Sequence, residues 1–131
     1  MIYGSKLSLL VLLLSFFLIT ITGCESNKNF SYELYDGYEI KSIDGEIKLY
    51  KDDLVFKIND LDYQIKTFKY NSDVVCLKLN DGSYYMIYYV DGSIYGPHTL
   101  SSLNETITSL SMEFNNDFRD INKVEGRVYE W

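Results

Sequence analysis

Four Asp-Gly pairs, which begin at residues 36, 44, 81 and 91, constrain the fold of this chain more than any other feature. Asp-Gly between alternating runs is typical of a tight β-hairpin, because a type I′ turn needs positive φ at both central residues. The clearest case is Asp44-Gly45, since residues 38–43 and 46–49 on either side both alternate. The pairs are irregularly spaced, so the pattern predicts an antiparallel β-meander and not a repeat array.

Other runs of β-branched and aromatic residues add to this meander, for which we expect about 6–8 strands in all. They are Leu54 to Ile58, Tyr63 to Tyr70, Val74 to Leu79, Tyr84 to Val90 and Ser93 to Tyr95. The run from Tyr84 is apolar on both faces, which predicts a strand in the middle of the sheet, covered on each side. Gly96-Pro97 is expected to end the sheet pattern.

After Pro97 the apolar period changes to that of a helix, with Leu103, Ile107, Leu110 and Phe114 on one face. Ser102 and Glu105 fit a capping box, so the helix is predicted from Ser102 to Asn115. An isolated helix of this length is marginal in water, so its apolar stripe must dock on the sheet. The predicted fold is α+β, an antiparallel β-meander with one C-terminal amphipathic helix, and residues 124–131 could add a last strand.

The N-terminal segment is typical of an export signal. Lys6 precedes an uncharged run from Leu7 to Thr22, and Ile21-Thr22-Gly23-Cys24 closes it. The run has 16 residues, fewer than the roughly 20 that a membrane-spanning helix needs. An ordinary secretory signal and a spanning anchor remain alternatives.

The closing sequence resembles the bacterial lipobox, in which the cysteine receives a diacylglyceryl group and the signal is cut before it. The resemblance implies lipidation at Cys24, with residues 1–23 as signal peptide, 24–30 as lipidated N-terminus and short tether, and 31–131 as a single globular domain. The protein is then expected on the outer face of the bacterial cytoplasmic membrane, held by acyl chains, of which two or three anchor stably.

The net negative charge of the chain argues against a nucleic-acid partner. Without residues 1–23 the chain holds 11 basic and 19 acidic side chains, and the basic ones are dispersed. A nucleic-acid surface needs clustered Lys and Arg, so we expect no nucleic-acid partner. If Cys24 carries lipid, Cys76 has no intramolecular partner, so a disulfide is not expected and Cys76 is interpreted as a half-buried strand residue.

Catalytic, cofactor and metal motifs are not found. The sequence lacks a nucleophile elbow, a zinc-protease helix, a phosphate loop and a dinucleotide glycine motif, and His98 is its only histidine. A calcium loop beginning at Asp60 would lack the required glycine and glutamate, because Ile65 and Asn71 stand at those positions. Paired carboxylates for glycoside hydrolysis stay open, since two acids can come from anywhere in the chain.

Tyrosines are the richest candidates for an interaction surface, with 12 beyond the signal. Tyrosine combines a large apolar area with a hydroxyl, which suits both interfaces and half-buried sheet faces. Tyr85 and Tyr89 share one face of the expected middle strand, and Tyr95 follows the next turn. If the helix leaves that face open, these residues form a platform for a peptide or a glycan. The alternative is that the helix packs there.

The stretches Tyr84-Tyr85-Met86-Ile87 and Gly92-Ser93-Ile94-Tyr95-Gly96-Pro97, the helix that follows, and Tyr35-Asp36-Gly37-Tyr38 together resemble small Gram-positive lipoproteins of unknown function. His98 departs from the leucine usual there. The resemblance implies an extracytoplasmic lipoprotein without an assigned catalytic site. We therefore expect a non-enzymatic binding or interaction module for an envelope protein, peptide or glycan, including a protector or inhibitor against a secreted protein. The alternative is a small cell-envelope hydrolase that uses paired carboxylates.

Overall fold

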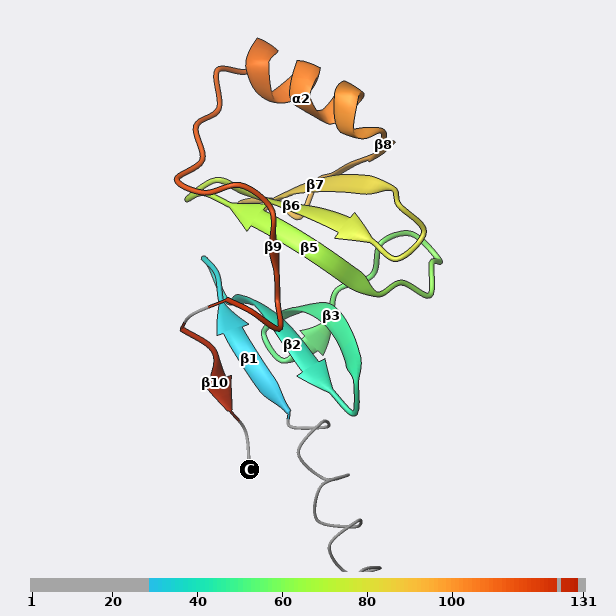
Figure 1. Cartoon of the computed structure of the whole chain (residues 1–131), viewed down its shortest axis with the longest axis vertical. Helices are drawn as coiled ribbons and strands as arrows, with labels where there is room; N and C mark the ends of the chain where they lie inside the picture. The colour runs from blue at the N-terminus through green and yellow to red at the C-terminus, as the bar shows by residue number, and fades with distance from the viewer. Residues whose placement is uncertain (1–28, 125, 130–131) are drawn as a thin grey trace, which may run out of the picture.

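The computed structural model describes residues 29–124 and 126–129, and these form two five-stranded antiparallel sheets and one short helix (Figure 1). The predicted signal peptide and Cys24 lie outside the described residues. The first sheet has the order β10-β1-β2-β3-β4 and the second β8-β7-β6-β5-β9. The elements are β1 (Phe30–Glu33), β2 (Tyr38–Ile43), β3 (Glu46–Lys51), β4 (Leu54–Val55), β5 (Ile65–Tyr70), β6 (Val74–Leu79), β7 (Tyr84–Tyr88), β8 (Ile94–His98), α2 (Leu100–Ser109), β9 (Arg119–Asp120) and β10 (Val128–Tyr129).

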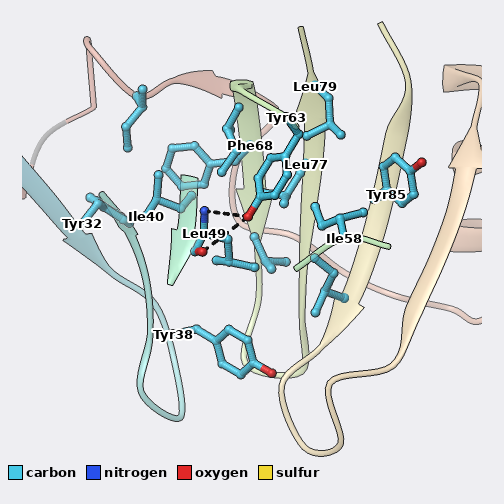
Figure 2. Close-up of a cluster of buried hydrophobic side chains, with 14 of the residues drawn as sticks. Tyr32, Tyr38, Ile40, Leu49, Ile58, Tyr63, Phe68, Leu77, Leu79 and Tyr85 are labelled. Atoms are coloured by element: carbon cyan, nitrogen blue, oxygen red, sulfur yellow. Dashed lines mark hydrogen bonds between the residues drawn. The ribbon is translucent and has the colours of Figure 1, made fainter. Parts of the chain in front are cut away.

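The expectation of a mostly antiparallel β protein with a helix on a sheet is confirmed, but the single meander is wrong. The strands divide into two sheets that face each other and bury 17 side chains between them, here called the inter-sheet core. Figure 2 shows Ile40 and Leu49 of the first sheet opposite Phe68 and Leu77 of the second. One sheet can cover only one face of another, so the two-sided burial of β6 and β7 needs a third layer.

That third layer is α2, which lies on the outer face of the second sheet (Figure 1). Leu103 is the buried residue of the helix. Its partners are Val74, Cys76, Tyr84 and Met86 of β6 and β7, and together these five residues are called the helix-side cluster. The helix therefore packs on the sheet, as its apolar stripe predicted.

The hairpin prediction at Asp44-Gly45 is confirmed. Both residues have positive φ, 53° and 80°, and β2 pairs with β3 in the expected register, with Ile43 opposite Glu46. At the later pairs only glycine has positive φ, and the aspartate accepts a hydrogen bond from the backbone of a serine two residues on, at 2.9 Å for both Asp81 and Asp91. The same dipeptide therefore makes two kinds of turn.

Several predicted boundaries are wrong. The helix begins two residues earlier and ends six residues earlier than predicted, and its N-cap is Thr99, whose side chain accepts from the Ser102 amide at 3.2 Å. Gly96-Pro97 does not end the sheet, because both residues lie in β8. A proline is tolerated there because β8 is an edge strand. The strand expected from Leu54 to Ile58 is reduced to β4.

The helix is also not the last element. After it the chain returns along the second sheet, adds β9 beside β5, buries Ile121 and Val124 in the inter-sheet core, and adds β10 beside β1. Figure 1 shows this segment crossing from one sheet to the other. The predicted strand in residues 124–131 is thus only β10, and the C-terminal segment joins the two sheets.

Candidate functional site

Strand β1 runs from one end of the molecule toward the other, and the two ends differ in what they carry. Its first residue, Phe30, follows Asn29, whose side-chain oxygen accepts a 3.0 Å hydrogen bond from the amide of Asp44, so the predicted tether enters beside the β2–β3 turn. The turn after β1 lies at the opposite end of the strand. There it meets the turns of the second sheet and the chain beyond α2. We call this the far end and define it as residues 35–37, 71–73, 89–92 and 110–117.

Two adjacent hollows open at the far end. The first, of about 510 Å³, carries three carboxylates and no basic residue, and we call it the acidic hollow. The second, of about 330 Å³, carries both signs of charge, from Lys69, Arg119, Glu113 and Asp117, and we call it the mixed hollow. The acidic hollow is lined by Asp36, Asn71, Ser72, Asp73, Tyr88, Tyr89, Val90, Leu110, Ser111, Met112 and Glu113. Both hollows share Asn71, Ser72 and Glu113.

Asn71 fixes the wall between the hollows. Its side-chain oxygen accepts from the backbone amides of Asp73 and Val74, at 2.8 and 2.9 Å, which closes the turn between β5 and β6. Its amide nitrogen donates to the backbone oxygen of Glu113 at 3.1 Å. The loop after α2 is therefore bonded to the turn that it faces, and the shape of both hollows depends on this contact.

The far end of the inter-sheet core is a continuous tyrosine cluster, made of Tyr32, Tyr35, Tyr38, Tyr70 and Tyr89. The ring of Tyr35 lies 5.8 Å from that of Tyr89 and 6.2 Å from that of Tyr70, measured between centroids. The hydroxyls of Tyr32 and Tyr70 are 2.6 Å apart. Burial, with this hydrogen bond, raises the pKa of Tyr32 to about 12. Within the cluster Tyr35 is the most accessible member, 46% exposed.

Tyr89 differs from the other cluster members in its hydroxyl. Among the described residues this is the only buried side-chain polar atom without a hydrogen-bond partner. Burial is the main cause that raises the pKa of this hydroxyl, and the neighbouring Tyr70 is the next largest. A hydroxyl that is buried without a partner costs free energy, so this group lowers the stability of the inter-sheet core.

The predicted platform of Tyr85, Tyr89 and Tyr95 is not formed. Tyr85 and Tyr89 are each only 3% exposed, because their face of β7 is covered by the first sheet and not by the helix. The helix covers the opposite face, at Tyr84 and Met86. Tyr95 is exposed and contacts the ring of Tyr88, which lines the acidic hollow. The platform hypothesis assigned the inner face of β7 to solvent because sequence alone did not show a second sheet.

Tyr35 and the Asn71 turn are the site residues that sequence reasoning missed. In the sequence, Tyr35-Asp36-Gly37 shows an aromatic residue beside a tight turn. Without knowledge of the opposing sheet, this tyrosine cannot be distinguished from the other tyrosines of the chain. Asn71 stands in Asn71-Ser72-Asp73, between the two predicted strands Tyr63 to Tyr70 and Val74 to Leu79. Its role depends on Glu113, which is 42 residues away.

Cys76 is completely buried, which goes further than the half-buried position expected. Burial raises the pKa of its thiol to about 12, so the reactive thiolate is scarce at neutral pH. His98 lies 3.0 Å from the hydroxyl oxygen of Ser102, through its Nδ1, and neither residue lines the two hollows at the far end.

Carboxylates do meet in the acidic hollow, but Asp36, Asp73 and Glu113 are all exposed. A glycosidase acid is normally kept protonated by an apolar pocket. Asp81 and Asp91 accept hydrogen bonds from Ser83 and Ser93, which lower the pKa of each carboxyl. In the part of the chain that the structure describes, no three His, Cys, Asp or Glu side chains are grouped to hold a metal ion.

The chain matches no family model, no curated protein and no solved structure. Among residues 29–124 and 126–129, no helix is long and apolar enough to cross a membrane.

Proposed function

We propose that this protein is a lipid-anchored extracytoplasmic binding module, without catalytic activity, whose contact surface is the far end. The observation that carries the proposal is the pair of hollows that meet at Asn71 and Ser72 beside the exposed ring of Tyr35. Small sites that combine aromatic rings with a few convergent polar groups are typical of ligand binding. Exposed tyrosine is also enriched at the centres of protein interfaces.

The arrangement of the termini supports this proposal. Asn29 is the fifth residue after Cys24, so a lipidated Cys24 reaches no further than about 18 Å from the domain at roughly 3.5 Å per residue. Asn29 is bonded to the end of the molecule opposite the far end. With the acyl chains in the membrane, the hollows face away from the bilayer and toward soluble partners.

Lipidation is tested by the substitution Cys24→Ser. We expect this variant to leave the membrane fraction or to remain unprocessed, because a serine hydroxyl does not receive the diacylglyceryl group. Incorporation of radiolabelled fatty acid, followed in cells, distinguishes wild type from the variant. Equal labelling of both proteins would rule out Cys24 as the lipid site.

Binding at the far end is tested by blocking it. Ser72→Trp places an indole at the residue shared by both hollows, and Ser101→Trp places one on the exposed surface of α2 as a matched control. Pull-downs from the envelope fraction of the source cells then compare the two variants with wild type. We expect a partner retained by wild type and by Ser101→Trp but lost with Ser72→Trp. A partner retained equally by all three proteins, or by none, contradicts the proposal.

A further inference from the structure

The charge and shape of the acidic hollow point to one class of occupant, and we infer that it binds a lysine or arginine side chain from an extended segment of a partner protein. This inference rests on the proposed function and names the chemistry of the partner. It uses the acidic hollow alone and leaves the mixed hollow without an assigned ligand.

Charge is the first argument. Asp36, Asp73 and Glu113 line the acidic hollow, and none of the eight other lining residues is basic. Lys69 and Arg119 line the mixed hollow instead. The ammonium of Lys51 donates to the backbone oxygen of Asp36 but does not line the acidic hollow. Three carboxylates around a concave surface concentrate a negative potential, which attracts cations and repels phosphate or carboxylate ligands.

The apolar rim is the second argument. Val90 is 85% exposed and Leu110 is 51% exposed, and both line the acidic hollow together with the half-buried Met112. Lysine and arginine carry three or four methylene groups below the charge, and these pack on apolar surface while the head group contacts carboxylates. A small inorganic cation uses only the carboxylates and leaves this rim exposed. The rim therefore favours a side chain with an aliphatic stem.

The test uses the full-length lipidated protein in nanodiscs of neutral phosphatidylcholine, with methyl NMR signals of Val90, Leu110 and Met112 as reporters. The probes are the capped tripeptide Leu-Lys-Leu, its neutral analogue Leu-Gln-Leu, and the trisaccharide of N-acetylglucosamine. We expect the lysine peptide to shift these methyl signals in a saturable way and to bind at least tenfold more tightly than the glutamine peptide.

The matched variants separate local charge from net charge. Asp36→Asn, Asp73→Asn and Glu113→Gln, made together, are expected to weaken the lysine peptide at least tenfold. The backbone oxygens of Asp73 and Glu113, which accept from Tyr89 and Asn71, remain in place. Asp44→Asn, Asp60→Asn and Glu105→Gln together remove the same charge elsewhere, and we expect less than a twofold change.

Three results overturn the inference: the lysine peptide fails to shift these signals, the two peptides bind equally, or both triple variants weaken binding equally. If the trisaccharide shifts the methyl signals while the lysine peptide does not, the cationic occupant is wrong but the far end still binds a ligand. If Ser72→Trp also retains every envelope partner, the proposed function itself fails. The two failures are therefore distinguishable.

Discussion

The two faces of the second sheet are covered in different ways. The inner face meets another sheet, and the inter-sheet core holds 17 buried residues, most of them from β1, β2, β3, β5, β6 and β7. The outer face meets α2 and the loop beyond it, and the helix-side cluster holds five, of which only Leu103 comes from the helix. Most of the apolar burial that stabilises the fold therefore lies between the two sheets, and the helix buries only a small part of the outer face.

The acidic hollow lies where the strongly packed second sheet meets the less buried chain that follows the helix. The acidic hollow has one wall from the turns of the second sheet and another from residues 110–113, which follow the helix. The first wall is anchored in the inter-sheet core through Tyr89. The second is held by fewer buried contacts, together with the hydrogen bond from Asn71 to Glu113. Binding regions are often drawn from such weakly held parts of a structure, because they can adjust to a partner.

The largest effect is expected from truncating Leu77, and Leu103 is its matched comparison. Both leucines are completely buried, Leu77 in the inter-sheet core and Leu103 in the helix-side cluster. Leu→Ala costs about 2–5 kcal/mol, depending on how well the cavity collapses. We expect about 3–5 kcal/mol for Leu77→Ala and about 2–3 kcal/mol for Leu103→Ala, because a helix can shift toward the cavity more easily than a central strand.

Urea unfolding, followed by tyrosine fluorescence and circular dichroism, measures both losses. A larger loss for Leu103→Ala than for Leu77→Ala would reverse the comparison and make the helix the main support of the fold.

The next effect concerns a polar contact inside the inter-sheet core. The hydroxyl of Tyr63 donates to the backbone oxygen of Phe56 at 2.6 Å and accepts from the amide of Leu49 at 3.2 Å. Figure 2 shows the bond to Leu49. Tyr63→Phe leaves the buried amide of Leu49 and the part-buried backbone oxygen of Phe56 without this partner, at an expected cost of about 1–3 kcal/mol.

Tyr95→Phe is the control for that substitution, because Tyr95 is exposed and its ring lies against the ring of Tyr88. We expect a change of less than about 0.5 kcal/mol in its unfolding free energy. Equal losses for the two tyrosines would show that the Tyr63 hydroxyl is not needed to hold Leu49 and Phe56.

The smallest effect is expected at Leu110. The helical stripe predicts that Leu110→Ala costs about 2–5 kcal/mol through lost burial. Since the side chain is half exposed at the rim of the acidic hollow, we expect less than about 1 kcal/mol, measured by the same urea unfolding. A loss above about 2 kcal/mol would show that Leu110 is buried on the helix-side cluster in solution.

Leu110 also shows where prediction from sequence stops. The apolar period continues through Phe114, yet the helix ends at Ser109 in a Schellman motif, with Ser111 donating to the Thr108 oxygen and Met112 to the Ile107 oxygen. The residue with positive φ in this motif is Ser111, at 53°, where glycine is usual. Without a glycine at this position the sequence has no stop signal there, so the predicted helix extends six residues past the observed end.

The sequence predicted local features well, but it did not predict which distant segments pack against them. The Asp44-Gly45 hairpin follows from backbone preferences of neighbouring residues, and the two-sided burial of β7 follows from its composition. Which layer covers each face depends on contacts between distant segments, such as Tyr38 with Tyr89. For that reason the sequence identified tyrosines as candidates but assigned the exposed role to Tyr85 and Tyr89 rather than to Tyr35.

Hydrogen exchange of the native protein tests the central claim most directly, namely that the inter-sheet core holds the fold and the helix covers it loosely. We expect the amides of β6 and β7 to exchange only through global unfolding. The amides of Leu103 in α2 and of its C-cap Leu110, which are bonded to Thr99 and Thr106, are expected to open with a lower free energy. Protection of both helix amides equal to that of β6 would contradict the account, because the helix would then unfold only together with the two sheets.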